Sequence, residues 1–171
     1  MLAHDQGGTA NASKMAANLN VSSVTIGRYT DLFVDLLLLR KLMPYSPNVK
    51  KRLIKSPRLY LRDSGIVHAL LNITCYNDLL GHPVVGKSWE GFVIENVAAY
   101  LPPQARLYYY RTASGAEIDL LIEFGISEIW AIEIKRGEQV SLGKGFYASM
   151  WPSIGLTGQD WDTKSGLSGH A

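Results

Sequence analysis

Three ionisable residues lie within two stretches of the sequence that otherwise have the composition of buried β-strands. Asp119 interrupts the apolar run 116–123, and Glu133 and Lys135 alternate with apolar residues in the run 131–135. An unpaired charge in an apolar environment costs several kcal/mol of folding free energy, or its pKa shifts until the group is neutral. We therefore expect these three side chains either to pair with one another or to bind a ligand.

Alternation along the second of these runs places Glu133 and Lys135 on one face of a strand, together with Ala131. The opposite face is apolar and carries Trp130, Ile132 and Ile134. If a strand over residues 118–123 pairs beside it, Asp119 lies close enough to Glu133 to share a metal ion. Mg²⁺ suits such a site because it binds one or two carboxylates together with waters and substrate phosphates. Lys135 would then orient an attacking water or stabilise charge on the phosphate.

A glutamate on the preceding helix is the fourth candidate. The sequence predicts a helix over residues 88–101, begun by a serine cap and ended by two prolines. Glu90 aligns with the apolar positions of this helix, whereas Glu95 is rotated from it by about 140°. We therefore expect Glu90 to face the sheet and to join Asp119 and Glu133 as a metal ligand. Glu95 is the substitute if the helix is rotated about its axis.

A structural interpretation of the same charges is also open. Glu133 and Lys135 can form a salt bridge on a solvent-facing sheet surface, with Asp119 as a polar residue near a turn. The presence of Asp119 on a neighbouring strand, and of a helix glutamate before it, favours the metal site. Activity is a separate question, because a domain can keep this scaffold after losing cleavage.

Residues 13–33 have the pattern of a helix-turn-helix. The pattern predicts a first helix capped by Ser13, a turn at Asn20, and a second helix capped by Ser22 or Ser23. Apolar residues recur at helical spacing along the second helix and leave a polar face free for DNA. The residues of this helix that we expect to contact DNA are Ser23, Thr25 and Arg28.

A basic segment follows the helix-turn-helix. Residues 40–62 include eight basic side chains and no acidic one, although the formal net charge of the whole chain is only +2. Strand-like runs over residues 36–42 and 59–61 flank the loop, which predicts a winged helix whose loop contacts the phosphate backbone. The loop residues expected to bind DNA are Lys50, Lys51 and Arg52. Two alternatives remain open: a solvated loop of ordinary lysines, or a winged helix used only for packing against protein.

The composition bounds the class of protein. With 171 residues, 47% of them hydrophobic and 19% charged, the chain can fold around one or two hydrophobic cores. The single cysteine, Cys75, excludes an internal disulfide, and we expect it to be a buried thiol. No signal-peptide or membrane-spanning pattern occurs, which predicts a cytoplasmic protein with no membrane partner. No phosphate-binding loop motif occurs either, so we expect no ATP site in this chain.

The predicted fold class is α+β, with four segments along the chain. A helix and three antiparallel strands, over residues 107–111, 118–123 and 129–135, begin an α-β-β-β-α core of the restriction-endonuclease type. The last strand of that core is predicted to be missing, because the end of the chain contains Pro152 and four glycines, a composition that favours disorder. The predicted segments are a winged helix-turn-helix over residues 1–66, a connecting segment over 67–87, a nuclease-like domain over 88–150 and a disordered tail over 151–171.

Several phrases of the sequence together resemble a domain of unknown function that follows the AAA+ ATPase module in many bacterial and archaeal ATP-binding proteins. The resemblance covers residues 1 to about 147. The matching phrases are 2–7, 21–29, 55–65, 86–95, 110–119 and 133–136. The resemblance implies a winged helix between an upstream ATPase and a nuclease-like domain of the PD-(D/E)XK type. ATP would then bind only to that upstream domain, which is absent from this chain, and the ATPase would be its partner.

The resemblance also implies a function. The catalytic residues would be Glu90, Asp119, Glu133 and Lys135, with Mg²⁺ as the cofactor and DNA as the partner. The alternative is a non-catalytic module that docks or regulates the ATPase and cleaves nothing.

Both ends of the chain depart from the pattern of the family. Too few residues precede Ser13 for the first helix of a helix-turn-helix core, and the sequence after residue 146 does not predict the closing strand. We therefore expect a fragment truncated at both ends.

Overall fold

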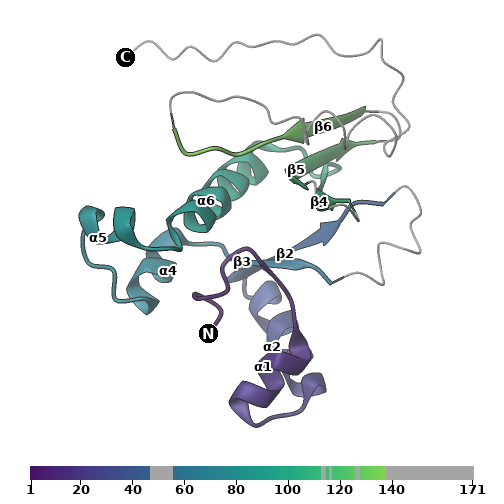
Figure 1. The fold of residues 1–171 in the computed structure, drawn as a ribbon. Helices are drawn as coiled ribbons and strands as arrows, with labels where there is room; N and C mark the ends of the chain where they lie inside the picture. Colours follow the sequence, from purple (N-terminus) through teal and green to yellow (C-terminus); the bar gives the residue numbers. More distant parts are fainter. Residues whose placement is uncertain (47–55, 113–114, 116, 126–127, 138–171) are drawn as a thin grey trace.

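One six-stranded mixed sheet forms the centre of the computed structural model, which describes residues 1–46, 56–112, 115, 117–125 and 128–137. The strand order is β1-β3-β2-β4-β5-β6 (Figure 1). The strands are β1 (Gly8–Thr9), β2 (Leu39–Pro44), β3 (Arg58–Leu61), β4 (Arg106–Arg111), β5 (Glu117–Phe124) and β6 (Glu128–Ile132). The helices are α1 (Ala12–Leu19), α2 (Ser23–Asp35), α4 (Ser64–Leu70), α5 (Tyr76–Gly81) and α6 (Val85–Tyr100). The predicted mixture of helices and strands is confirmed.

The sheet joins strands from both halves of the sequence. β2 pairs in parallel with β4, with Met43 opposite Tyr108 and Pro44 opposite Tyr109. The other neighbouring strands are antiparallel, including the predicted series β4, β5 and β6. Strands that precede and strands that follow the predicted connecting segment, residues 67–87, therefore belong to one hydrogen-bonded sheet.

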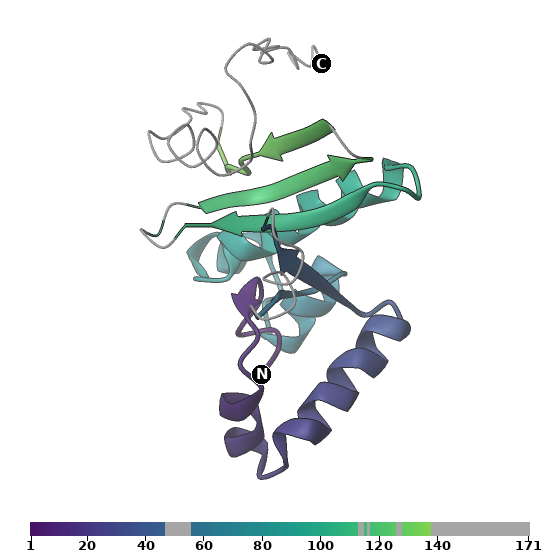
Figure 2. The same ribbon diagram turned by 90° about the vertical axis from the view of Figure 1, so that its right-hand side faces the viewer.

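The N-terminal helices have the predicted order but a different first cap. Asn11 precedes α1 and its Oδ1 accepts a hydrogen bond from the amide of Lys14 at 2.9 Å, so Ser13 lies inside the first turn and is not the cap. Asn20 ends α1 in the left-handed conformation, with a φ of 53°, at the predicted turn. Ser22 caps α2 through a 3.1 Å hydrogen bond from the amide of Thr25. Figure 2 shows both helices at the end of the molecule farthest from β6.

The two strands predicted to flank the basic loop pair with each other. β2 and β3 are antiparallel, with Leu39 opposite Leu61. The prediction that the first strand begins at residue 36 is wrong, because α2 continues to Asp35 and Leu37 then takes a positive φ of 58° before the strand. Residues 47–55 lie outside the described part of the chain.

The predicted connecting segment contains helices. Asp63 caps α4 by accepting a 3.1 Å hydrogen bond from the amide of Ile66, as its sequence position indicates. The sequence did not predict α5. Cys75 stands at the N-terminal cap of α5 and is exposed, so the expectation of a buried thiol is wrong. A cap residue lies outside the helix proper, and here its side chain remains in solvent.

Helix α6 begins three residues before the predicted serine cap. Ser88 therefore lies inside the helix, where its Oγ is hydrogen-bonded to Nε2 of His68 at 2.7 Å. The helix lies along one face of the sheet, where Ile94 packs with Leu120 and Ile122 (Figure 1). A second cluster, which includes Tyr108, Tyr110 and Ile118, forms the core on the other face.

A glycine allows α6 to approach β3 closely. A Cβ atom added to Gly91 would lie 2.9 Å from Nε2 of Gln6 and 3.2 Å from the ring of Tyr60. A side chain at this position would require Gln6 or the ring of Tyr60 to shift. The close approach brings the glutamates of α6 to the side chains of β2 and β3.

The C-terminal part of the prediction is only partly within the described residues. The sequence predicted that Glu133 and Lys135 lie inside the third strand. This is wrong, because β6 ends at Ile132 and both residues follow it. The tail over residues 151–171 lies outside the described residues. No helix in the described ranges is long and apolar enough to cross a membrane.

Candidate functional site

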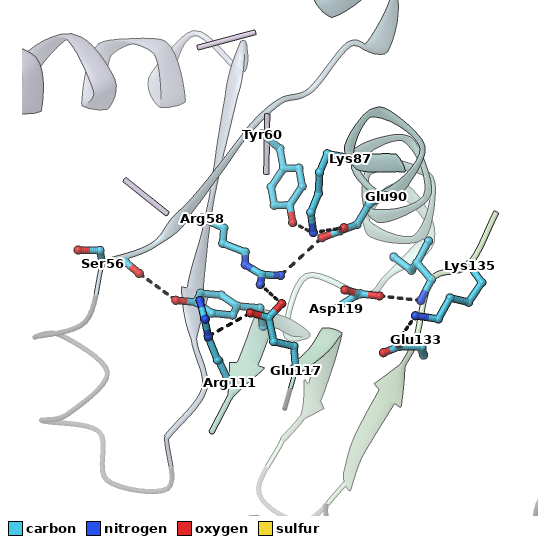
Figure 3. Close-up of polar contacts among 12 residues, drawn as sticks. Ser56, Arg58, Tyr60, Lys87, Glu90, Arg111, Glu117, Asp119, Glu133 and Lys135 are labelled. Atoms are coloured by element: carbon cyan, nitrogen blue, oxygen red, sulfur yellow. Dashed lines mark hydrogen bonds and ion pairs between the residues drawn. The ribbon is translucent and has the colours of Figure 1, made fainter. Parts of the chain in front are cut away.

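Glu90 points into the protein from α6. It is only 6% exposed and lies on the same side of the helix as the fully buried Ile94, the orientation that helical periodicity predicts. The hydroxyl of Tyr60 donates a hydrogen bond to Oε1 of Glu90, and the ammonium of Lys87 donates to Oε2 (Figure 3). Burial, followed by the charge of Glu90 and its hydrogen bond, raises the pKa of Tyr60. Tyr60 therefore stays protonated and serves as a donor to Glu90.

Arg58 connects Glu90 to strand β5. It is 4% exposed, and its Nη1 lies 3.6 Å from Oε1 of Glu90 while its Nη2 donates to Glu117. Its guanidinium carbon also lies 4.6 Å from the centre of the Tyr109 ring. Glu117 pairs in addition with Nε of Arg111 at 3.1 Å. We call this group the Arg58 cluster; its members are Arg58, Tyr60, Lys87, Glu90, Arg111 and Glu117 (Figure 3).

The neighbouring acids keep Arg58 protonated. Burial alone lowers the pKa of Arg58, but the hydrogen bond to Glu117 and the neighbouring negative charges outweigh burial and raise it. Arg58 is therefore a permanent buried cation between two carboxylates. A buried charge of this kind is tolerated because it is paired.

A β-bulge re-aims Asp119. Tyr108 lies opposite Leu121 and Tyr110 lies opposite Ile118, so the one residue between them on β4 faces two residues on β5, namely Asp119 and Leu120. Ile118 and Leu121 pack in the same cluster on one face of the sheet, whereas Leu120 packs with α6 on the other. The extra residue thus brings Asp119 to the face that α6 covers, an arrangement typical of bulges next to functional sites.

The segment after β6 lies against Asp119. The amide of Ile134 donates a 2.9 Å hydrogen bond to Oδ2 of Asp119, and the β5–β6 register continued by one residue sets Asp119 opposite Glu133. Lys135 pairs with Oε1 of Glu133. The hydrogen bond that Lys135 donates to Glu133 raises the pKa of Lys135, and the negative charges of Glu133, Asp119 and Glu90 add to this effect. Lys135 thus lies near enough to Glu133, Asp119 and Glu90 for their charges to affect its pKa.

Two buried polar atoms of the described residues lack a hydrogen-bond partner, and both belong to this region. They are Nη1 of Arg58 and Oε2 of Glu133. A buried carboxylate oxygen without a donor is costly, and a cation would satisfy it. Asp119 and Glu133 therefore fit Mg²⁺, which takes one or two carboxylates and completes its shell with water.

Glu90 fits the metal less well than the other two acids, because its carboxylate already has a lysine, an arginine and a tyrosine as neighbours. Within the described ranges, no three His, Cys, Asp or Glu side chains are grouped so as to hold a metal ion. The inclusion of Glu90 among the metal ligands stays a prediction.

Glu95, the substitute acid, lies in a separate group. Its two oxygens accept hydrogen bonds from Arg40, the longer of them 3.0 Å, and from Nε of Arg62 at 2.7 Å. Burial opposes ionisation of Glu95, but the hydrogen bonds from Arg40 and Arg62 outweigh it and lower the pKa of this carboxyl. We call Arg40, Arg62 and Glu95 the Glu95 cluster. It ties α6 to β2 and to the end of β3.

The residues predicted to contact DNA are only partly described. Ser23 and Arg28 are exposed on α2, whereas Thr25 is half-buried and its hydroxyl lies 2.8 Å from Oγ of Ser22 in the helix cap. The loop residues Lys50, Lys51 and Arg52 lie outside the described part of the chain.

The four basic residues of segment 40–62 that the structure describes are all paired with acids of the protein. Arg40 and Arg62 pair with Glu95, Lys41 pairs with Asp31, and Arg58 pairs with Glu117. The sequence analysis treated this segment as one basic surface, with Arg58 as one of its eight basic residues. It gave no role in the site to the other members of the Arg58 cluster apart from Glu90, which are Tyr60, Lys87, Arg111 and Glu117. For Glu117 a signal was present, because it alternates with Asp119 along a strand.

Comparison with known proteins gives two family matches along the chain. Residues 1–76 match a domain of unknown function (DUF8612), and residues 85–148 match a second domain of unknown function (DUF4143). Arg58 and Tyr60 lie in the first matched segment, and Glu90 and Asp119 lie in the second.

Two curated relatives are uncharacterized proteins of mycobacteria: Rv2008c of Mycobacterium tuberculosis and Mb2031c of Mycobacterium bovis. Each is 39% identical to this chain over 150 residues, a match that covers 88% of the chain and 34% of the relative, so the chain spans about a third of the length of these relatives. No solved structure matches the chain. Two segments of the chain therefore match domains of unknown function, and the candidate site draws residues from both.

Proposed function

We propose that this chain is part of an AAA+ type ATP-binding protein and carries a Mg²⁺-dependent, nuclease-like site at Asp119, Glu133 and Lys135. One observation supports this most strongly. Asp119 contacts the backbone of the segment that carries Glu133 and Lys135, while Oε2 of Glu133 is buried without a donor. The ATPase association rests on the sequence resemblance, and the greater length of the mycobacterial relatives is compatible with it.

The proposed chemistry is hydrolysis of a phosphodiester bond. Mg²⁺, when bound, supplies a Lewis acid and lowers the pKa of an attacking water. Asp119 and Glu133 would hold the ion, and Lys135 would orient the water or stabilise negative charge on the phosphate. The raised pKa of Lys135 keeps its side chain protonated and therefore suited to the phosphate.

A cleavage assay tests the proposed activity. The 171-residue chain is incubated with single- and double-stranded DNA in Mg²⁺ or Mn²⁺, and we expect Asp119→Ala and Lys135→Ala each to lower the cleavage rate by about 100-fold or more. Glu128→Ala, which removes an exposed acid from β6, is the matched control and should retain activity. Cleavage that survives both site variants would show that the assigned residues are wrong.

DNA association through the winged helix is a separate part of the proposal. Arg28 and the loop residues Lys50, Lys51 and Arg52 would contact phosphates, so affinity should fall steeply with salt. Changing the three loop residues together to alanine should lower the affinity and reduce the slope of log affinity against log salt by about two to three. An unchanged affinity and slope would remove the loop from the proposed interface.

A non-catalytic module that docks or regulates the ATPase is the second candidate. It is favoured by an apolar cavity of about 560 Å³ at the N-terminal end of the molecule, lined by α1, α2 and α4 residues such as Leu19, Phe33 and Leu70. A surface of this kind suits protein packing better than DNA. This candidate gains if the chain neither cleaves DNA nor binds a divalent ion through Asp119 and Glu133.

A further inference from the structure

We infer that Lys87 and Arg58 are positioning residues that hold Glu90 back from the metal site and so compete with a divalent ion for its carboxylate. The inference rests on the proposed function, because it concerns the same site. Glu133 pairs with Lys135 through one oxygen and keeps the other without a hydrogen-bond partner, whereas both oxygens of Glu90 are engaged.

Neighbouring side chains contact both carboxylate oxygens of Glu90. Both of its oxygens are engaged by groups of the protein: Oε2 by the ammonium of Lys87, and Oε1 by the hydroxyl of Tyr60 with Nη1 of Arg58 at 3.6 Å. By contrast, Oε2 of Glu133 has no hydrogen-bond partner. Two acids that the sequence assigns to one site therefore differ in whether a ligand must first displace an internal cation.

The Arg58 cluster and the group of the proposed metal ligands also differ in formal charge. The Arg58 cluster holds three cations, Arg58, Lys87 and Arg111, against the carboxylates of Glu90 and Glu117. The group formed by Asp119, Glu133 and Lys135 holds one cation against two carboxylates. Each group thus has an excess of one formal charge, of opposite sign. The charge of Glu90 also contributes to raising the pKa of Lys135, which belongs to the other group. Figure 3 shows the residues of both groups. Removing a cation from the Arg58 cluster makes the whole region more attractive to a divalent ion.

Lys87 is the better residue to change, because its side chain is 41% exposed and lies at the surface of the buried cluster. Its truncation removes the donor to Oε2 of Glu90 and leaves Oε1 with Tyr60 and Arg58, so the carboxylate as a whole keeps a donor. Arg58 is deeply buried, and its removal tests stability as much as binding.

Calorimetric titration of the full chain with Mn²⁺ tests the inference without relying on catalysis. We expect Lys87→Ala to bind Mn²⁺ about threefold to tenfold more tightly than the unaltered chain, because Oε2 of Glu90 no longer pairs with a lysine and its charge becomes available to the ion. Glu90→Gln alone should change the affinity by less than about twofold, and the double variant Lys87→Ala/Glu90→Gln should lose the gain. Lys41→Ala, which removes a lysine paired with Asp31, controls for the change in net charge.

The outcomes separate this inference from the proposed function. If Lys87→Ala leaves the affinity unchanged or weakens it, while Asp119→Ala abolishes binding, the metal site stands and the withholding of Glu90 is wrong. If Glu90→Gln weakens binding as much as Asp119→Ala, Glu90 is already a ligand and the inference is wrong in the same way. If Asp119→Ala has no effect or the chain binds no Mn²⁺, the proposed function itself fails.

Discussion

Helix α6 carries two glutamates, Glu90 and Glu95, whose surroundings differ in a useful way. Glu95, with a side chain 14% exposed, is shared between two arginines, and among the described residues this cluster has no ion pair with the proposed metal ligands. Glu90 belongs to a cluster that continues through Arg58 to Glu117 on β5, two residues before Asp119. The first group fastens the helix to the N-terminal strands. The second connects those strands to the candidate site.

The largest expected effect is a difference in stability between variants of two arginines, Arg58 on β3 and Arg62 directly after it. Arg58→Ala removes a buried cation and should lower the free energy of unfolding by about 3 kcal/mol. Arg62→Ala removes a cation whose side chain is 31% exposed and leaves Arg40 on Glu95, so it should cost about 1 kcal/mol or less. Urea denaturation followed by circular dichroism measures both values. Equal losses would mean that the two clusters are energetically alike.

The next effect tests the close approach of α6 to β3. Gly91→Ala should lower the free energy of unfolding by about 1 to 3 kcal/mol, because the added Cβ meets Gln6 and Tyr60 at less than ordinary contact distance. Gly86→Ala is the matched control on the same helix, where an added Cβ meets nothing within 4 Å. If thermal denaturation gives the two variants the same midpoint, the approach is looser than described.

The smallest effect concerns the pH dependence of Glu95. Its pKa is lowered in the folded chain by Arg40 and Arg62 against the opposing effect of burial, so ionised Glu95 adds stability above the pKa of the unfolded state. That contribution is lost as the pH falls below about 4.3, the ordinary pKa of glutamate, and through the lower folded value. The stability difference between the unaltered chain and Glu95→Gln should therefore shrink in acid. A difference that stays constant with pH would contradict the ion-pair account.

Much of the local structure was predictable because its signals lie within a few neighbouring residues. The cap at Ser22, the turn at Asn20 and the antiparallel strands before Lys135 all follow from short patterns. The inward direction of Glu90 follows from helical periodicity alone. These features depend on local geometry, which the sequence expresses directly.

The rest depends on contacts between distant parts of the chain. Arg58 appears in the sequence as one of eight basic residues in an acid-free segment, and only folding shows that its partner Glu117 lies 59 positions away on β5. The bulge that turns Asp119 toward α6 arises from a register shift between β4 and β5, which no pattern within β5 indicates. The parallel pairing of β2 with β4 is likewise a tertiary choice.

The proposed function depends on binding of a divalent ion by Asp119 and Glu133. Electron paramagnetic resonance counts free Mn²⁺ directly as the full chain is added. We expect a single site that is lost in both Asp119→Ala and Glu133→Ala and kept in Glu128→Ala. Binding that persists in either of the first two variants, or no binding by the unaltered chain, would contradict it.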